Sequence, residues 1–304
     1  GPMSRGLGDV YKRQLYGRGT CDMKGFVALA MATMVKAKSL DLQRPLQLAL
    51  SRDEEVGLLG APDVSQGLLD NFAKVDAVIV GEPTEMKVVT GHKSCDDLQF
   101  HVRGHEVHSS LLHEGVSAVM CGARFVEWVR KQNVENQAKE PSPVAALYNP
   151  PFTTLHVGQI NGGTANNITA KDCYFSIDLR CVGDERPEDW QSKIQQEIEL
   201  IEREMQIVNP DSFFKMDVMP GPAVVPEVDG KAEVLARRLT GDNGIHTVAY
   251  GTDGGHFQNR GFSVVICGPG SITQAHQADE FIQVSELQAG EKMLDSLLTT
   301  LQTV

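Results

Sequence analysis

The chain has 304 residues, of which 41% are hydrophobic and 22% charged, and its net charge is −12. Chains longer than about 250–300 residues usually form more than one domain, so we expect two. The acidic balance argues against nucleic acid and membrane as partners, because both favour a basic surface. No apolar run approaches the roughly 20 residues that span a bilayer. The six scattered cysteines form no C-x-x-C pair, which indicates reduced thiols and a cytoplasmic protein.

The first 14 residues differ in texture from the rest of the chain. Gly1-Pro2-Met3 resembles the end of a cleaved tag followed by a start codon, and residues 4–14 show no hydrophobic periodicity. We therefore interpret residues 1–14 as a tag or cloning remnant and leave them out of the expected fold.

The next segments predict an α/β layer. Residues 15–19 are the end of a strand that enters a glycine-rich turn, and residues 25–38 are apolar on nearly all sides, as in a buried helix. Residues 46–50 alternate like a strand, and residues 76–81 form a short apolar run closed by glycine, which suits a buried strand. This order predicts a sheet with helices on both faces.

At about Gly91 the pattern changes to that of an α+β domain. Strands with one exposed face are expected at 98–102, 153–160, 174–181 and 214–218, where apolar and polar residues alternate. Helices are expected at 118–132 and from Pro187 onward. The order strand-helix-strand-strand-helix-strand is ferredoxin-like. We therefore predict an inserted ferredoxin-like domain at residues 91–220.

After the insertion, the sequence returns to the α/β pattern of residues 15–90. A helix is expected at 231–240 and a buried strand at 262–267, and Ser285 with Gln288 predicts a capping box for a final helix. Residues 15–90 and 221–304 are therefore assigned to one α/β domain.

Acidic residues and a histidine follow the expected buried strands. They are Asp22, the run Asp53-Glu54-Glu55, Glu82 and His276. In open α/β sheets ligands bind at the carboxyl ends of strands, and carboxylates that converge there are costly without a cation. Each residue alone is more often a helix cap or a solvated loop side chain. As a set in one topological position, they predict a site for Zn²⁺ or a similar divalent ion.

These residues stand in motifs that resemble those of the M20 family of metallohydrolases. Residues 17–25 (GRGTCDMKG) resemble the family's G-x-G-x-x-D-M-K-G, residues 53–57 (DEEVG) its D-E-E-x-G, and residues 81–84 (GEPT) its G-E-P-[TS]. Residues 267–281 (CGPGSITQAHQADEF) resemble the form of the last motif found in the family's acetylornithine deacetylases. The resemblance runs from about Leu15 to the C-terminus in the family's motif order.

The resemblance implies a role for each candidate. Asp22 would bridge two zinc ions, Glu82 would bind the first ion, and Glu55 and His276 would complete the site of the second. Glu54 would be the general base that acts on a zinc-activated water. The implied fold is a zinc-hydrolase sheet domain with an inserted lid, and the implied cofactor is Zn²⁺, two ions in the intact family, with Co²⁺ as the alternative ion.

The resemblance also implies residues that bind substrate. His108 would stabilise an oxyanion across a homodimer interface, so that the inserted domain acts as lid and dimerisation domain. Asn167 would contact substrate, and Arg180 would clamp its carboxylate, with a solvated strand arginine as the alternative. Gly251 and Thr252 stand in a stretch that loosely matches the family's substrate loop.

One family motif has no counterpart here. The family carries an early His-x-Asp whose histidine binds the first zinc, and no such sequence precedes Gly17. We therefore expect the catalytic domain to be N-terminally incomplete, this chain to bind one zinc ion or none, and its activity to be impaired.

Three functional hypotheses follow from these observations. The first is metal-dependent hydrolysis of N-acetyl-L-ornithine to L-ornithine and acetate, a step of arginine biosynthesis, in which Asp253 would favour a cationic side chain. The second keeps the chemistry but acts on succinyl-diaminopimelate or another N-acyl amino acid. The third, which the missing His-x-Asp favours, is an inactive metal-binding or dimerisation module.

Overall fold

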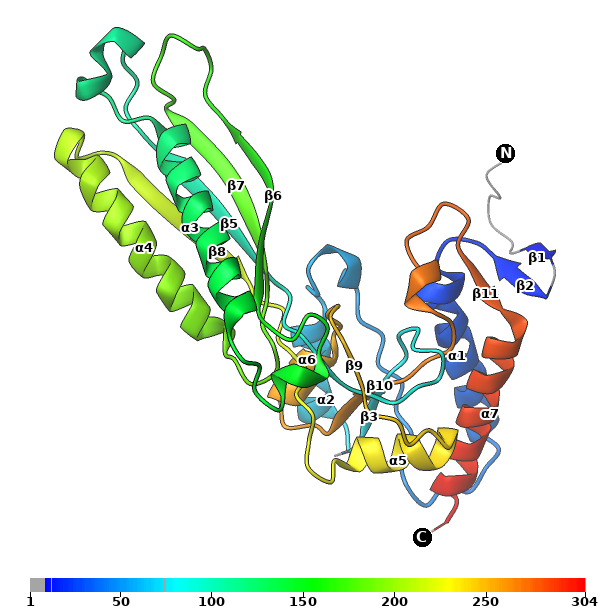
Figure 1. Ribbon diagram of the computed structural model, residues 1–304. Helices are drawn as coiled ribbons and strands as arrows, with labels where there is room; N and C mark the ends of the chain where they lie inside the picture. The colour runs from blue at the N-terminus through cyan, green and yellow to red at the C-terminus, as the bar shows by residue number, and fades with distance from the viewer. Residues whose placement is uncertain (1–8, 12, 74, 304) are drawn as a thin grey trace. The chain divides into compact units, whose positions relative to one another are not determined.

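The computed structural model describes residues 9–11, 13–73 and 75–303, which form two compact units (Figure 1). Unit 1 comprises residues 1–92, 224–248 and 252–304, and unit 2 comprises residues 93–223 and 249–251. The sequence predicted an insertion at residues 91–220; the roles of the units as catalytic domain and lid stay predictions. Within the described residues, none of the helices combines the length and apolarity that a bilayer crossing requires.

Unit 1 contains a mixed four-stranded sheet and a smaller antiparallel one. The larger sheet has the order β3 (Val78–Val80), β10 (Val264–Ile266), β4 (Val89–His92) and β9 (His246–Val248). Strand β10 is parallel to β3 and antiparallel to β4. The smaller sheet joins β1 (Asp9–Tyr11), β2 (Gln14–Tyr16) and β11 (Phe281–Gln283). All three residues of β10 are buried, in agreement with its continuous apolar sequence.

Helices pack around these sheets in unit 1. They are α1 (Gly25–Ala37), α2 (Ala61–Asn71), α5 (Lys231–Thr240), α6 (Gly254–Asn259) and α7 (Val284–Leu301), with short helical turns η1 (Thr20–Lys24), η2 (Glu54–Val56) and η5 (Ile272–Gln274). Helices α1 and α7 lie side by side (Figure 1). Their apolar residues share a core with Val265 and Cys267, so the predicted α/β class is confirmed.

Unit 2 is a four-stranded antiparallel sheet covered by two helices. The sheet order is β6 (Thr154–Gly162), β7 (Asp172–Arg180), β5 (Asp96–Arg103) and β8 (Phe213–Met219). The helices are α3 (Ala118–Ala138) and α4 (Pro187–Val208), and the turns η3 (Ser109–Glu114) and η4 (Ala145–Leu147) complete the unit. In chain order this is β5-α3-β6-β7-α4-β8, the predicted ferredoxin-like pattern.

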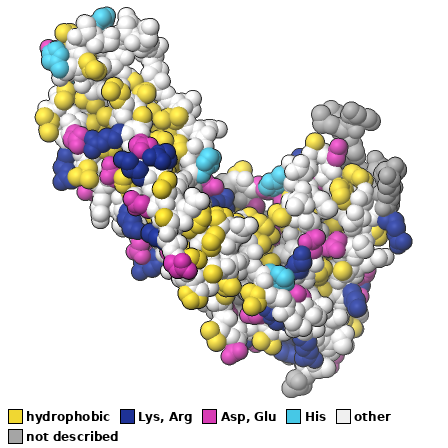
Figure 2. All heavy atoms as spheres, viewed as in Figure 1, with side chains coloured by type: hydrophobic (Ala, Val, Ile, Leu, Met, Phe, Trp, Pro, Cys, Tyr) yellow, Lys and Arg dark blue, Asp and Glu magenta, His cyan; other side chains and the backbone are white. Residues whose placement is uncertain are grey.

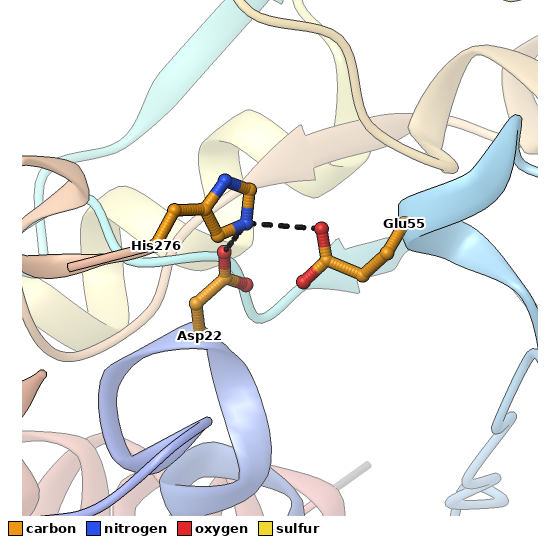
Figure 3. Close-up of side chains that lie close together, drawn as sticks. All are labelled: Asp22, Glu55 and His276. Carbon is orange, nitrogen blue, oxygen red and sulfur yellow. Dashed lines mark ion pairs between the residues drawn. The ribbon is translucent and has the colours of Figure 1, made fainter. Parts of the chain in front are cut away.

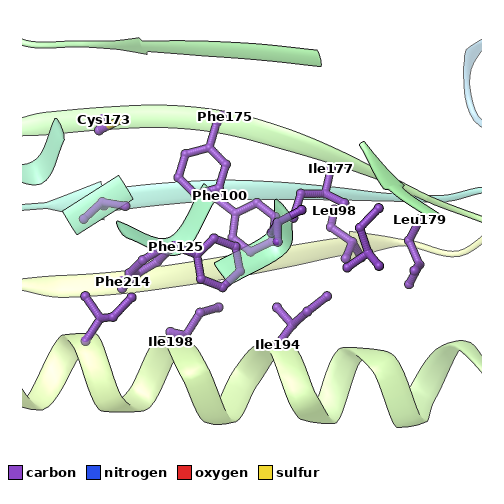
Figure 4. Close-up of a cluster of buried hydrophobic side chains, with 14 of the residues drawn as sticks. Leu98, Phe100, Phe125, Cys173, Phe175, Ile177, Leu179, Ile194, Ile198 and Phe214 are labelled. Carbon is purple, nitrogen blue, oxygen red and sulfur yellow. The ribbon is translucent and has the colours of Figure 1, made fainter. Parts of the chain in front are cut away.

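The core of unit 2 is built around Phe100 (Figure 4). Its ring stacks on Phe175 at a centroid distance of 4.8 Å and lies 5.3 Å from the ring of Phe125. Helix α4 adds Ile194 and Ile198 from the opposite side, and both are fully buried. Every second residue of β5 is buried, and the buried residues of α4 are three or four positions apart. These two sets of side chains therefore pack in one cluster.

Residues 46–50 are not a strand, contrary to expectation. A strand needs a neighbour to complete its backbone ladder, and in the described part of the chain no backbone hydrogen bond joins these residues to another segment. The capping box is also wrong: α7 begins at Val284, so Ser285 already lies inside the first turn.

Residues 9–11 and 14 take part in the fold, although residues 1–14 were expected to lie outside it. Strand β1 pairs with β2, and Gln14 pairs with Gln283 of β11. Residues 1–8 and 12 lie outside the described residues.

On the face that Figure 2 shows, basic side chains are interspersed with acidic ones.

Ile194→Ala should destabilise unit 2 by about 2–5 kcal/mol, because it removes a fully buried side chain from the core and leaves a cavity. Ile207→Ala is the matched control on the same helix, since Ile207 is 85% exposed. Its effect should stay within about 0.5 kcal/mol. Urea unfolding can be followed by fluorescence, because both tryptophans, Trp128 and Trp190, lie in unit 2. Equal destabilisation by the two variants would contradict this packing.

Candidate metal centre

Asp22, Glu55 and His276 converge in unit 1 (Figure 3). His276 Nε2 lies 3.2 Å from Asp22 Oδ2 and 2.9 Å from Glu55 Oε2. One potential ligand atom from each residue lies within 4.8 Å of the other two. Two carboxylate oxygens and an imidazole nitrogen at this spacing are a donor set that suits a divalent transition metal.

Short turns bring these three side chains together. Asp22 lies in η1, directly after β2 and the turn at Gly19, whose φ of +79° favours glycine. Glu55 lies in η2, which follows Asp53 in a left-handed conformation. His276 follows η5 and has a φ of +58°, a conformation that costs a non-glycine residue roughly 1–2 kcal/mol. Such strain is concentrated at functional sites in proteins.

Glu82 and Glu54 lie beside this cluster, in environments that favour their neutral forms. Glu82 is buried behind Gly81 at the end of β3. Burial, followed by the charges of Asp22 and Glu54, holds its pKa well above the ordinary value. Burial likewise raises the pKa of Glu54 to about 7, with further contributions from Asp253, Glu55 and Asp22.

Asp253 contributes one more carboxyl group to the same region. It is buried before α6, and its Oδ2 accepts a hydrogen bond from the Ser51 hydroxyl. Its Oδ1 is buried and has no hydrogen-bond partner among the described residues. Burial raises the pKa of Asp253 above its ordinary value. Asp22, Glu54, Glu55, Glu82 and Asp253 all line a cavity of about 720 Å³.

Within unit 2, His108 and Asn167 lie close together. The Ser109 amide donates to the Asn167 carbonyl at 2.8 Å, and His108 forms an isolated bridge with Ile168. Both side chains are exposed, and His108 Nδ1 lies 2.8 Å from the Ser110 hydroxyl. An exposed imidazole is available to a partner or a substrate.

The other predicted substrate residues are divided between the two units. Arg180 is at the end of β7, where its Nε pairs with Asp178 at 2.7 Å. Gly251 belongs to the same unit, and a Cβ there would lie 3.8 Å from Arg180 Nη1. Thr252 belongs to unit 1 and is buried, with its hydroxyl 3.1 Å from His92 Nε2 and accepting from the Gly254 amide. The Thr252 hydroxyl therefore already has hydrogen-bond partners within unit 1.

Comparison with known proteins identifies the family. The model of peptidase family M20/M25/M40 matches residues 8–300. The chain belongs to the M20 family. An acetylornithine deacetylase from Myxococcus xanthus is 32% identical over 286 residues, which cover 92% of this chain and 71% of the relative. An acetylornithine deacetylase from Pasteurella multocida is 28% identical over 288 residues, covering 94% and 72%.

Solved structures share the fold at low sequence identity. A tripeptidase from Staphylococcus aureus has a TM-score of 0.73 at 18% identity, and the aminopeptidase PepT from Bacillus cereus has 0.71 at 17%. Each match covers 97% of this chain and 76% of the other. These likenesses support the α/β class assigned to the chain, which as an M20 protein is a hydrolase of the peptidase and amidohydrolase type.

The M20 family is metal-dependent, and the residues of this chain fit a metal. Several carboxyl groups that raise one another's pKa values are stabilised as carboxylates when a divalent cation neutralises them. Asp22, Glu55 and His276 could supply three protein ligands, which is the number that a catalytic tetrahedral zinc site uses.

One residue of this region could not be assigned a role from the sequence. Glu280 lies within the last family motif, and its carboxylate accepts hydrogen bonds from the amides of Gly19, Cys21 and Asp22. In the sequence, Glu280 is distinguished only as an acidic residue four positions after His276. Its backbone partners are more than 250 positions away in the chain.

One divalent ion should bind per chain at Asp22, Glu55 and His276. His276→Ala removes one ligand, so zinc affinity should fall by more than the roughly 10–100-fold that loss of an outer-shell partner costs. His246→Ala is the control, because His246 pairs with Asp242 outside the cluster. Elemental analysis measures the number of ions per chain, and competitive chelator titration measures the zinc affinity. Two tightly bound ions per chain would contradict this assignment.

Proposed function

We propose that this chain hydrolyses the amide bond of N-acyl amino acids, with N²-acetyl-L-ornithine as the substrate, and that zinc is its cofactor. The observation that carries the proposal is the Asp22, Glu55 and His276 cluster with Glu54 beside it. The substrate is supported by the names of the M. xanthus and P. multocida relatives. The products would be L-ornithine and acetate.

The protein's own residues supply acid–base chemistry in this proposal. When bound, zinc would polarise the amide carbonyl and lower the pKa of a nearby water. Glu54 would accept a proton from the attacking water and deliver it to the amine as the C–N bond breaks. Burial raises the pKa of its carboxylate to about 7 when no cation is bound, and zinc would lower that value, which favours the ionised form that accepts the first proton.

The substrate's charges match side chains of both signs. Arg180 is proposed to bind the α-carboxylate, since a guanidinium presents paired donors to carboxylate oxygens. Asn167, which lies beside His108 at the other end of β7, is proposed to contact the substrate of the partner protomer together with His108. Asp253 is proposed to favour the substrate's ammonium group, which would give its buried Oδ1 the partner it lacks among the described residues. N²-acetyl-L-ornithine carries both of these charges, a carboxylate and an ammonium group.

The test is a panel of acyl amino acids assayed with the purified chain and with Glu54→Gln. N²-acetyl-L-ornithine should be hydrolysed faster than succinyl-diaminopimelate. Glu54→Gln should keep its metal and lose about 10²–10⁴ in turnover, because a positioned acid–base group is worth that much in rate. Glu55→Gln is the neighbouring control and should lose the metal itself, because Glu55 is a proposed ligand.

The other outcomes decide between the alternatives. Faster hydrolysis of succinyl-diaminopimelate would identify that compound as the substrate instead. Metal binding without turnover on any substrate would favour the inactive metal-binding module. Near-normal turnover by Glu54→Gln would remove Glu54 from the mechanism.

A homodimer is the proposed assembly, with His108 of one protomer acting in the active site of its partner. His108→Ala and Glu54→Gln should each be nearly inactive alone. Mixed after dissociation and reassembly, they should recover up to about a quarter of wild-type activity, because half of the statistical dimers contain one intact composite site. Light scattering would establish the dimer. Absence of recovery in proven mixed dimers would contradict action across the interface.

A further inference from the structure

Glu280 is a buried carboxylate beside the metal centre that is not itself one of the grouped ligands. It lies four residues after His276 and directly before β11, and its side chain is 2% exposed. A carboxylate removed from water needs several donors to stay stable.

Three backbone amides of the loop that carries Asp22 supply those donors. The Gly19 amide donates to Glu280 Oε2 at 2.7 Å, and the amides of Cys21 and Asp22 both donate to Oε1 at 3.0 Å. The exposed Arg18 guanidinium lies 3.6 Å from Oε2. Neighbouring backbone amides that point at one anion resemble a nest, and here the anion is a side chain of the protein.

The loop requires this anchor because its backbone is irregular at Asp22. Within η1, Asp22 has φ −119° and ψ 93°, which is not helical. Cys21 and Asp22 lie in the first turn of η1, where even a regular helix has no internal acceptor for its amides, so Glu280 accepts from both. Without them, the amide of the buried Cys21 would lose its partner, which is costly.

The segment from His276 to Glu280 thus affects the positions of two proposed ligands, His276 itself and Asp22. His276 presents its Nε2 3.2 Å from Asp22 Oδ2, while Glu280, four residues later, holds the Asp22 amide. The pairing of Tyr16 with Phe281 brings the two segments together, and the Gly17 amide donates to the Glu280 carbonyl.

We propose that Glu280 is a positioning residue that sets the spacing between Asp22 and His276 and thereby the affinity and geometry of the metal site. The inference rests on the metal chemistry of the proposed function. It assigns to Glu280 an effect on the metal that a residue with a purely structural role would not have.

Glu280→Gln tests the inference, because the amide replaces one acceptor oxygen by a donor at nearly constant volume. Co²⁺ affinity should fall roughly 10–100-fold, as for loss of an outer-shell partner, and the visible Co²⁺ spectrum should change. Hydrogen exchange of the Gly19, Cys21 and Asp22 amides should become about tenfold faster or more, because bonds to a charged acceptor are lost.

Asp242→Asn is the matched control within unit 1. Asp242 likewise accepts two backbone amides, from Val88 at 2.8 Å and Gly244 at 3.1 Å, but lies outside the metal cluster. It should lower the melting temperature without changing the Co²⁺ affinity or spectrum.

Three results would count against the inference in different ways. Wild-type Co²⁺ affinity and spectrum in Glu280→Gln would overturn it. Equal loss of affinity in Glu280→Gln and Asp242→Asn would show a general effect of stability and overturn it as well. If the wild-type chain binds no Co²⁺ while Glu280→Gln still accelerates amide exchange, the proposed metal chemistry fails, and the anchoring of the loop stands alone.

Discussion

Repulsion among carboxyl groups is the constraint around which unit 1 is organised. Asp22, Glu54, Glu55, Glu82 and Asp253 line one cavity, and the proximity of like charges together with burial raises the pKa values of Glu54 and Glu82. A protein gains nothing in stability from such a grouping unless a cation or a proton compensates it. The imidazole of His276 points at two of these carboxylates, which makes a metal ion the natural compensating charge.

The fold holds this unfavourable arrangement through backbone contacts. Asp22 and His276 lie on loops that the pairing of β2 with β11 joins, and Glu280 binds the Asp22 loop through its amides. Glu82 follows β3, whose neighbour β10 leads into the loop of His276. Asp22, Glu82 and His276, which are far apart in the sequence, therefore depend for their positions on two strand pairings and one buried carboxylate.

Much of this arrangement could be predicted from the sequence, because the patterns concerned are local. Period-2 alternation along residues 98–102 and the helix expected from Pro187 onward helped to predict the ferredoxin-like unit, and motif positions predicted which acids would lie near His276. Residues 46–50 alternate as a strand would, yet a strand also depends on a partner that local sequence does not reveal. Glu280 escaped prediction for a related reason, because its partners are backbone amides, which carry no residue identity.

Asp22, Glu55 and His276 are proposed to bind one metal ion together. X-ray absorption at the zinc edge of the zinc-loaded chain, compared with His276→Ala, tests this binding. We expect oxygen and nitrogen ligands at about 2.0–2.2 Å, with a single imidazole contribution that disappears in the variant. A sulfur ligand at about 2.3 Å, or an imidazole signal unchanged by His276→Ala, would contradict it.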